Sequence, residues 1–335
     1  MQTNQMVKRV IICGLGSIGT RHLRLIRENW PNIEISALRS KENKHIDYDI
    51  EENINQTFFS ISDSLDWSPD CVIISNPASR HLEYALPFAK ESKHLFIEKP
   101  LGTSLELQSE WEELKKYSRN IKILIGYVFR HDEGIRKIKE LMASMDHILE
   151  ADFYCGSWLP NWRPNQKSFK ESVSSIKELG GGVLLELSHE IDLAYWLFGK
   201  LKINYSFLES TNLLKLKVED KALIHATAKN NSCSITFRLN FCSRPDQRFI
   251  RITGSDSYIE YDLLKCKLIF VKRNETEIFE FNNSKDHKYL NQLIHFFECI
   301  EKDKPTICNL SDGLEVLDYI KVCKDIDFNL KKTCE

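Results

Sequence analysis

The sequence predicts an α/β fold with two domains, of which the first holds a doubly wound parallel sheet and the second a sheet of consecutive strands. With 335 residues, the chain has the length of two domains. Over roughly the first 125 residues, short apolar runs alternate with helical patterns, which is typical of a parallel sheet with helices on both faces. From residue 203 on, strand-like segments follow one another without intervening helices, and this indicates an antiparallel or mixed sheet.

Apolar runs define the strands of the first domain. They cover residues 7–13, 33–38, 71–75, 95–98 and 121–126, with a further short apolar stretch near Phe58. Helices are expected between them over residues 20–29, 82–91 and 105–117. The sequence contains no low-complexity linker between the two domains, so the domain boundary is inferred from the change in topology alone. Residues 1–127 are expected to form the first domain and residues 128–335 the second.

The second domain contains a long irregular stretch over residues 156–179. A helix is expected over residues 183–198, with Gly199 as its end. Strands are then expected over residues 203–208, 222–228, 234–240, 249–253, 257–262, 268–271 and 277–281. Two helices, residues 289–302 and 311–325, are expected to close the chain.

Composition excludes several classes of protein. Lys and Arg number 46 against 48 Asp and Glu, so no basic field favours nucleic acid or acidic membranes. No apolar run approaches the roughly 20 residues that span a bilayer, and the polar residues 1–9 do not resemble a signal peptide. The ten cysteines are scattered without a Cys-x-x-Cys pair, which favours reduced thiols in a cytoplasmic protein and no zinc site.

A glycine motif, Gly14-x-Gly16-x-x-Gly19, follows the first strand and opens the first helix. This context predicts a dinucleotide-binding turn, in which Gly14 permits the tight turn, Gly16 lets a pyrophosphate approach the backbone, and Gly19 packs helix against strand. Backbone N–H groups at the helix start, at Ser17 and Ile18, are expected to bind the phosphates. The alternative is an ordinary glycine-rich turn.

Arg39 follows the second strand, at the place where sites selective for NAD usually carry a carboxylate about 20 residues after the glycines. An arginine suits a 2′-phosphate, with Ser40 and Lys41 as helpers, so the pattern favours NADP over NAD. A solvent-exposed basic turn is the alternative, and an arginine can also stack on adenine without selecting for phosphate.

Asn76 and Pro77 follow the strand at residues 71–75 and are expected to shape the wall of the cofactor crevice. His81 comes just after them, at the start of the next helix. Its position is more consistent with capping or packing that helix than with catalysis, although it borders the same crevice.

Glu98-Lys99-Pro100 ends the strand at residues 95–98. The proline locks its own φ and pushes the preceding residue out of helical geometry. A lysine at the carboxyl end of a parallel strand lies where open α/β sheets bind their ligands. Since lysine supplies a movable proton and a positive charge, Lys99 is a predicted catalytic residue.

The helix expected over residues 183–198 is apolar on most sides and should be buried. Glu186, His189 and Glu190 would share one face of it by their i, i+3 and i+4 spacing. Two readings remain open: an active-site histidine tuned by a carboxylate, or a structural histidine satisfied by its neighbours.

Five further residues are candidates for substrate binding. Tyr127 and Arg130 could reach substrate at the domain junction, or Arg130 could form an interdomain salt bridge. Trp158 and Trp162 could offer aromatic faces to a sugar ring and Arg163 could bind an anionic group, or the tryptophans could anchor a loop.

Together these residues resemble the Gfo/Idh/MocA family of NAD(P)-dependent oxidoreductases. The resemblance covers nearly the whole chain. It rests on the glycine motif, Asn76-Pro77 with His81, Glu98 to Gly102, residues 180–199, and Pro305 through Leu314. It implies a Rossmann domain followed by an α+β domain on a mostly antiparallel open sheet. It also implies a homodimer or homotetramer that acts on a sugar, nucleotide sugar or polyol.

The resemblance also implies roles for single residues. Lys99 and His189 match the family's catalytic lysine and histidine, and Glu98 lies in the motif that borders the cofactor. Hydride would pass between nicotinamide and a sugar carbon, with His189 as general acid/base and Lys99 bonded to the same oxygen. The family's aspartate, four residues before the histidine, is replaced by Leu185, and Glu186 stands three residues before it.

The segment with Trp158, Trp162 and Arg163 is similar to that of family members associated with bacterial surface-sugar biosynthesis, which favours a sugar or nucleotide-sugar substrate. Two alternatives stay open: a dinucleotide-binding sensor without turnover, and an NAD-dependent glycosidase of the same family. The presence of both Lys99 and His189 favours an enzyme over a sensor.

Overall fold

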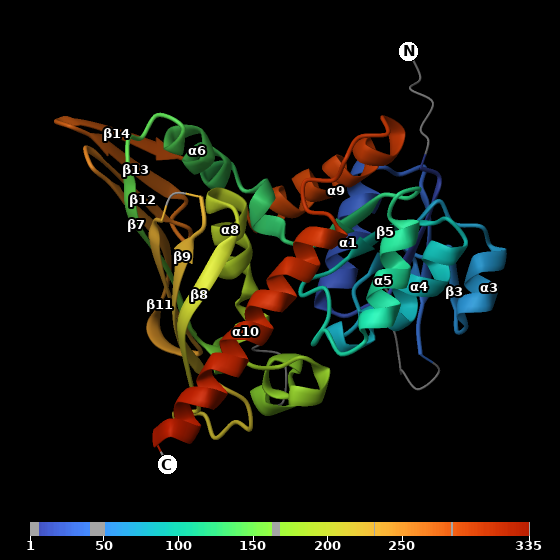
Figure 1. Cartoon of the computed structure of the whole chain (residues 1–335). Helices are drawn as coiled ribbons and strands as arrows, with labels where there is room; N and C mark the ends of the chain where they lie inside the picture. Colours follow the sequence, from blue (N-terminus) through green and yellow to red (C-terminus); the bar gives the residue numbers. More distant parts are fainter. Residues whose placement is uncertain (1–6, 41–50, 163–167, 231, 283, 335) are drawn as a thin grey trace. The chain divides into compact units, whose positions relative to one another are not determined.

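The computed structural model describes residues 7–40, 51–162, 168–230, 232–282 and 284–334. These form two compact units (Figure 1). Unit 1 contains the residues up to Val128 together with Asp286–Leu314, and unit 2 contains Phe129–Lys285 together with the residues from Glu315 on. The structure differs from the sequence-based division in the segment Asp286–Leu314, which belongs with the N-terminal unit.

Unit 1 is built on a parallel sheet in the order β3-β2-β1-β4-β5-β6. The strands are β1 (Arg9–Cys13), β2 (Glu34–Leu38), β3 (Gln56–Phe58), β4 (Cys71–Ile74), β5 (His94–Ile97) and β6 (Ile123–Ile125). Their apolar runs are buried nearly throughout, as expected for strands covered by helices on both faces. The strand order reverses between β1 and β4. Open α/β sheets bind their ligands at the carboxyl ends of the strands at such a point.

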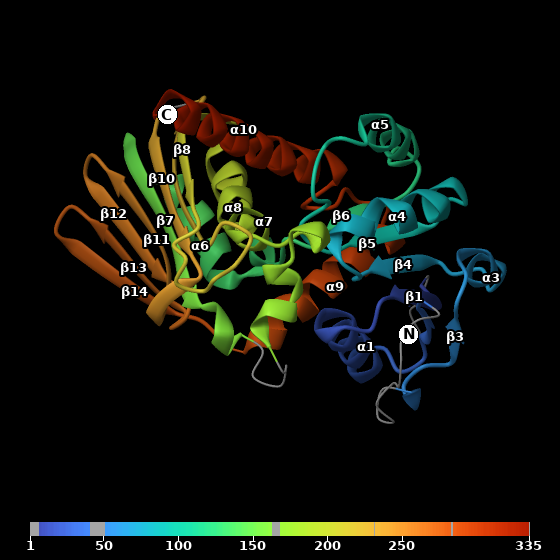
Figure 2. The ribbon, with the colours of Figure 1, turned by 90° about the horizontal axis from the view of Figure 1, so that it is seen from below.

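Helices cover both faces of this sheet. They are α1 (Ser17–Asn29), α3 (Ile61–Asp66), α4 (His81–Lys90), α5 (Gln108–Tyr117) and α9 (Lys285–Glu301). Figure 2 shows α1 and α9 on one side and α4 and α5 on the other. Phe296 packs on Phe96 and Phe297 on Trp30, with ring centroids 5.7 and 4.9 Å apart. These contacts explain why α9, remote in sequence, belongs to unit 1.

Unit 2 holds an eight-stranded sheet in the order β14-β13-β12-β11-β7-β10-β9-β8. Its strands are β7 (Ile148–Trp158), β8 (Leu201–Glu209), β9 (Lys221–Ala228), β10 (Ser234–Asn240), β11 (Cys242–Gly254), β12 (Ser257–Asp262), β13 (Lys267–Lys272) and β14 (Glu275–Glu280). All neighbours are antiparallel except β7 and β10, so the sheet is mostly antiparallel, as predicted.

One face of this sheet is packed and the other is more open, as the alternating burial along β9 and β12 indicates. The remaining described α-helices are α6 (Glu133–Met142), α7 (Val183–Glu186), α8 (Ser188–Phe198) and α10 (Leu310–Cys334). Figure 1 shows α6 and α8 against the same face of the sheet. Phe153 of β7 packs there on Phe198 and Phe237.

The irregular stretch after β7 consists largely of short 3-10 helices. They are η3 (Leu159–Asn161), η4 (Phe169–Glu171), η5 (Val173–Ser175) and η6 (Lys177–Leu179). The single helix expected over residues 183–198 is wrong, because Leu187, with φ −100° and ψ 27°, interrupts it between α7 and α8. Glu186 therefore ends one helix while His189 and Glu190 lie in the first turn of the next.

Asp132 joins α6 to the sheet of unit 2. Its Oδ1 accepts a hydrogen bond from the Ile135 amide, which caps α6, and another from the Tyr261 hydroxyl at 2.9 Å. The side chains of Asp132 and Tyr261 are buried. Burial raises the pKa of Tyr261, so this hydroxyl stays a donor.

We expect Asp132→Ala to lower the free energy of unfolding by about 2–4 kcal/mol, since it removes a cap and leaves a buried hydroxyl unsatisfied. Tyr261→Phe, which removes the hydroxyl but keeps the Asp132 cap, should cost only about 1 kcal/mol. Urea titrations of both variants measure the two costs. Equal losses would mean that the α6 cap contributes nothing.

Candidate active site

The glycine turn between β1 and α1 closes tightly on the end of β4. Gly14 has φ +87°, and a Cβ there would lie 3.1 Å from the Asn76 backbone. A Cβ on Gly19 would collide with the Gly14 carbonyl oxygen. These two positions therefore need glycine for conformation and for close approach.

At Gly16, by contrast, neither the backbone conformation nor a neighbouring protein atom requires glycine. Its φ of −74° is accessible to any residue, and a Cβ there would meet nothing within 4 Å. Gly16 is the N-cap residue of α1, and it has no side chain that could accept hydrogen bonds from the first N–H groups of the helix, at Ser17 and Ile18. The space above Gly16 and these donors suit an anion such as a pyrophosphate.

Asn76 follows β4 and packs against Gly14. Its amide nitrogen and oxygen are both buried, and neither makes a hydrogen bond with the part of the chain that the structure describes. Buried polar groups are normally satisfied, so this amide indicates a ligand that supplies a donor and an acceptor. The Asn76 amide and the open space at Gly16 together fit the binding of a dinucleotide.

His81 is fully buried at the start of α4, behind Asn76. Its Nε2 lies 2.9 Å from the Asn76 carbonyl oxygen and its Nδ1 3.3 Å from that of Leu101. Burial lowers the pKa of His81, so the ring is neutral near pH 7. His81 thus connects the backbone at Asn76 to the segment after Lys99, which is consistent with a packing role.

Arg39 and Ser40 directly follow β2 and are half-buried. The Arg39 amide donates to the Phe58 carbonyl at the end of β3, which fixes its backbone at the carboxyl edge of the sheet. Lys41, the predicted helper, and Arg163, the predicted anion-binding residue, lie outside the described residues.

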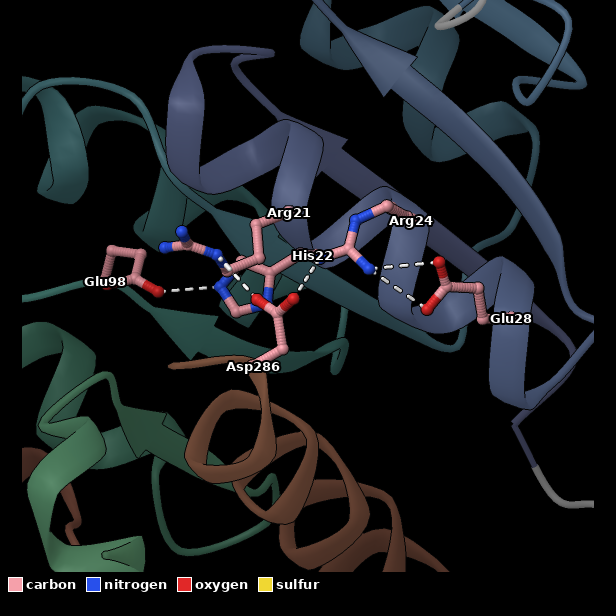
Figure 3. A network of polar contacts seen from close by, with 6 residues as sticks. All are labelled: Arg21, His22, Arg24, Glu28, Glu98 and Asp286. Atoms are coloured by element: carbon pink, nitrogen blue, oxygen red, sulfur yellow. Dashed lines mark hydrogen bonds and ion pairs between the residues drawn. The ribbon is translucent and has the colours of Figure 1, made fainter. Parts of the chain in front are cut away.

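Lys99 lies two residues after β5 and is half-buried. Beside it, the buried Glu98 carboxylate places Oε1 2.7 Å from Nε2 of His22 on α1 (Figure 3). Its Oε2 accepts a hydrogen bond from the Lys99 amide at 3.3 Å. A Cβ on Gly126, just after β6, would come within 2.8 Å of the same carboxylate. Glu98 is therefore enclosed by groups from three elements of unit 1.

In unit 2, His189 lies in the first turn of α8. Its ring meets Phe129 edge to face, with centroids 4.9 Å apart. The Arg248 guanidinium lies 4.0 Å from the centroid of Phe129, and it forms an ion pair with the buried Glu190 carboxylate at 2.6 Å. The ion pair of Glu190 and Arg248 thus places a guanidinium against the Phe129 ring, which in turn packs on His189.

Arg130 and Asp192 form a second buried ion pair of unit 2, and each side chain is only 1% exposed. The guanidinium Nη2 lies 2.6 Å from Oδ1, and Nε lies 3.1 Å from both carboxylate oxygens. This ion pair is not the interdomain salt bridge considered for Arg130, since it joins two elements of unit 2 and holds α8.

The remaining candidates differ in exposure. Tyr127 is fully buried, and Glu186 is half-buried at the end of α7. Trp162 donates from Nε1 to the Ser157 hydroxyl at 2.6 Å and packs edge to face on Phe241, which favours the anchoring of a loop. Trp158 is half-buried, with the Arg244 guanidinium 3.5 Å from its ring centroid.

Sequence reasoning did not identify His22, Phe129 or Arg248. A histidine on the apolar face of the first helix was the one available signal for His22, beside Leu23 and Ile26. Within the described residues, no group of His, Cys, Asp and Glu is arranged to hold a metal ion, and no helix has the length and apolar character to cross a bilayer.

Models of one protein family match most of the chain. Residues 8–124 match the Gfo/Idh/MocA model described as "Oxidoreductase family, NAD-binding Rossmann fold", and residues 153–329 match "Oxidoreductase family, C-terminal alpha/beta domain". An uncharacterized oxidoreductase of Streptococcus pneumoniae serotype 4 is 26% identical over 267 residues, which are 78% of this chain and 70% of that protein.

Solved structures share the fold. A UDP-N-acetylglucosamine 3-dehydrogenase from Acidithiobacillus ferrooxidans has a TM-score of 0.76 at 19% identity, covering 96% of this chain and 98% of its own. A levoglucosan dehydrogenase in complex with NADH has a TM-score of 0.82 at 16% identity, covering 96% and 97%.

We expect Gly16→Ala to raise the Kd for NADH and NADPH roughly tenfold or more, a cost of ~1.4 kcal/mol per tenfold, because its methyl group takes the space of the phosphates. Its melting temperature should stay within about 2 °C of the wild type, since the methyl group meets no protein atom. Cofactor fluorescence and thermal unfolding measure the two effects, with Arg24→Ala on the exposed side of α1 as the control. Unchanged affinity would place the phosphates elsewhere.

Proposed function

Because the chain belongs to the Gfo/Idh/MocA oxidoreductase family, we propose that it is an NAD(P)-dependent dehydrogenase of a sugar or nucleotide sugar. The observation that carries the proposal is the edge of the unit 1 sheet. There the open space at Gly16, the unsatisfied amide of Asn76 and the half-buried Lys99 follow three successive strands in space. A dinucleotide site and a proton-bearing lysine at one sheet edge suit hydride transfer.

The substrate class is supported by the names of the similar proteins. They include dehydrogenases of UDP-N-acetylglucosamine and levoglucosan, and a myo-inositol 2-dehydrogenase of Thermotoga maritima. We propose that this protein's substrate is likewise a sugar, nucleotide sugar or polyol, and that the reacting group is one of its hydroxyl-bearing carbons.

A nicotinamide cofactor, when bound, supplies or accepts the hydride. We assign its phosphates to the N–H groups of Ser17 and Ile18, and further polar contacts to Asn76. Lys99 would hydrogen-bond the reacting oxygen and stabilise the negative charge that develops there. His189 would take the hydroxyl proton during oxidation or return it during reduction. Glu186 is assigned a supporting role at the end of α7, near His189 in sequence.

For the cofactor we propose NADP rather than NAD. Arg39 lies at the end of β2, next to the strand that leads into the glycine turn, and its backbone is fixed by Phe58. A guanidinium at this position suits a 2′-phosphate, which a carboxylate would repel.

We expect Lys99→Met to lower kcat by about 10²–10⁴-fold while the Kd for the cofactor changes little, because the lysine acts on substrate oxygen. The measurement is absorbance at 340 nm with NADPH or NADP across a panel of sugars, polyols and UDP-sugars. Lys93→Met, just before β5, is the matched control. Turnover like that of the wild type in Lys99→Met would remove Lys99 from the mechanism.

The same panel separates the alternatives. Binding of NADPH or NADH by the wild type with no turnover of any compound would favour a sensor. Release of nitrophenol from nitrophenyl glycosides, dependent on a trace of NAD and without net change at 340 nm, would favour a glycosidase.

We expect Arg39→Ala to raise the Kd for NADPH about 10–100-fold, as loss of a charge-assisted hydrogen bond worth ~1.5–3 kcal/mol implies. The Kd for NADH should stay nearly constant. Lys115→Ala on the exposed face of α5 removes the same charge and serves as control. An equal loss for both cofactors would mean that Arg39 stacks on adenine without selecting the phosphate.

A further inference from the structure

The Glu98 carboxylate occupies both of its oxygens with contacts inside unit 1. Oε1 lies 2.7 Å from His22 Nε2, and Oε2 accepts the Lys99 amide hydrogen at 3.3 Å. The Glu98 side chain is 10% exposed, and a Cβ on Gly126 would come within 2.8 Å of its Oε2. Because a carboxylate buried in this way needs donors, its position depends on His22.

His22 is fixed as a donor by its surroundings. Its side chain is completely buried, with Phe96 and Tyr289 edge to face at 4.9 and 6.3 Å between centroids. Nδ1 makes no hydrogen bond with any residue that the structure describes. A proton on Nδ1 would be an unsatisfied donor against aromatic rings, so the hydrogen-bond pattern assigns the proton to Nε2, which donates to Glu98.

His22 also belongs to the helix whose N-terminus faces the glycine turn. Gly16 and His22 are six residues apart, which corresponds to about 9 Å along one rigid helix. The N-terminus of α1 thus offers N–H donors for phosphates. The second turn of the same helix carries His22, which binds the Glu98 carboxylate, and this carboxylate accepts a hydrogen bond from the Lys99 amide.

We propose that His22 is a positioning residue that acts through Glu98 to set the place of Lys99 relative to the phosphate-binding end of α1. This inference rests on the proposed function, since it assigns the purpose of the contact to the reaction of Lys99. In a positioning role, the effect of a substitution at His22 depends on how far the hydrogen-bond donor reaches. In a packing role, it would depend on the volume of the side chain.

A neighbouring network offers a matched control. On the exposed side of α1, Arg21 and Arg24 bind the Asp286 carboxylate at the start of α9, and Arg24 also binds Glu28 (Figure 3). These ion pairs join α1, which carries His22, to α9, which packs on His22 through Tyr289. Arg24 bonds Asp286 and Glu28 instead of Glu98, so Arg24→Ala perturbs the helix contact without touching the carboxylate.

The test compares two amides of different reach. The amide nitrogen of Gln extends about as far as His Nε2, whereas that of Asn stops near the place of Nδ1. With the sugar that the panel identifies, we expect His22→Asn to lower kcat about 10–100-fold, the range that a displacement near 1 Å can cause. His22→Gln and Arg24→Ala should remain within about threefold of the wild type, and the Kd for NADPH should change by less than about threefold throughout.

A second readout needs no turnover. Trace acetylation with an N-hydroxysuccinimide ester, followed by mass spectrometry of peptides, measures the rate at which each lysine amine reacts. Relative to Lys115, we expect the rate at Lys99 to change at least about threefold in His22→Asn and to stay constant in His22→Gln and Arg24→Ala, because the ammonium position depends on the donor.

The outcomes separate the two proposals. If the wild type turns over no compound, the proposed function fails and acetylation alone decides the role of His22. If His22→Asn matches the wild type in both readouts, the positioning role is overturned. It is also overturned if His22→Gln loses as much as His22→Asn, since the loss would then follow ring packing and not the donor.

Discussion

Buried carboxylates need partners, and this constraint organises the surroundings of both predicted catalytic residues. In unit 1, His22 holds Glu98, which in turn bonds the Lys99 amide. In unit 2, Arg130 binds Asp192 and Arg248 binds Glu190, and both carboxylates lie on α8, the helix that carries His189. Removing one member of a buried ion pair leaves an uncompensated charge at a cost of about 3–5 kcal/mol, so these contacts restrict the backbone around each site strongly.

The sequence predicted the parts of the fold that local patterns determine. Alternating apolar runs gave the parallel sheet of unit 1, and consecutive strands gave the mostly antiparallel sheet of unit 2. The family resemblance, drawn from motifs such as the glycine turn and Glu98-Lys99-Pro100, is confirmed by the matching family models. β7 was not predicted although it lies inside its sheet, because Glu150 and Asp152 interrupt its apolar pattern. Its pairing with β10 and β11 depends on contacts far apart in sequence.

For the candidate site, the sequence located residues that follow strands and glycine turns, such as Asn76 and Lys99. It could not show that the Asn76 amide is unsatisfied or that His22 reaches Glu98, because both facts arise from tertiary contacts. The break at Leu187 also depends on packing and separated Glu186 from the helix of His189. The assignments of catalytic, cofactor and substrate residues stay predictions, as do the homodimer or homotetramer, the cytoplasmic location and a role in surface-polysaccharide biosynthesis.

The arrangement around Lys99 bears on the choice between an enzyme and a sensor. A protein that only binds a dinucleotide requires the space at Gly16 and the amide of Asn76, and neither depends on the side chain after β5. Burial of Glu98 carries a desolvation cost that dinucleotide binding does not explain. That cost is offset by two hydrogen bonds, one of which fixes the backbone of the neighbouring lysine. Since hydride transfer requires a donor held at a defined distance from the reacting oxygen, such fixation favours catalysis over passive binding.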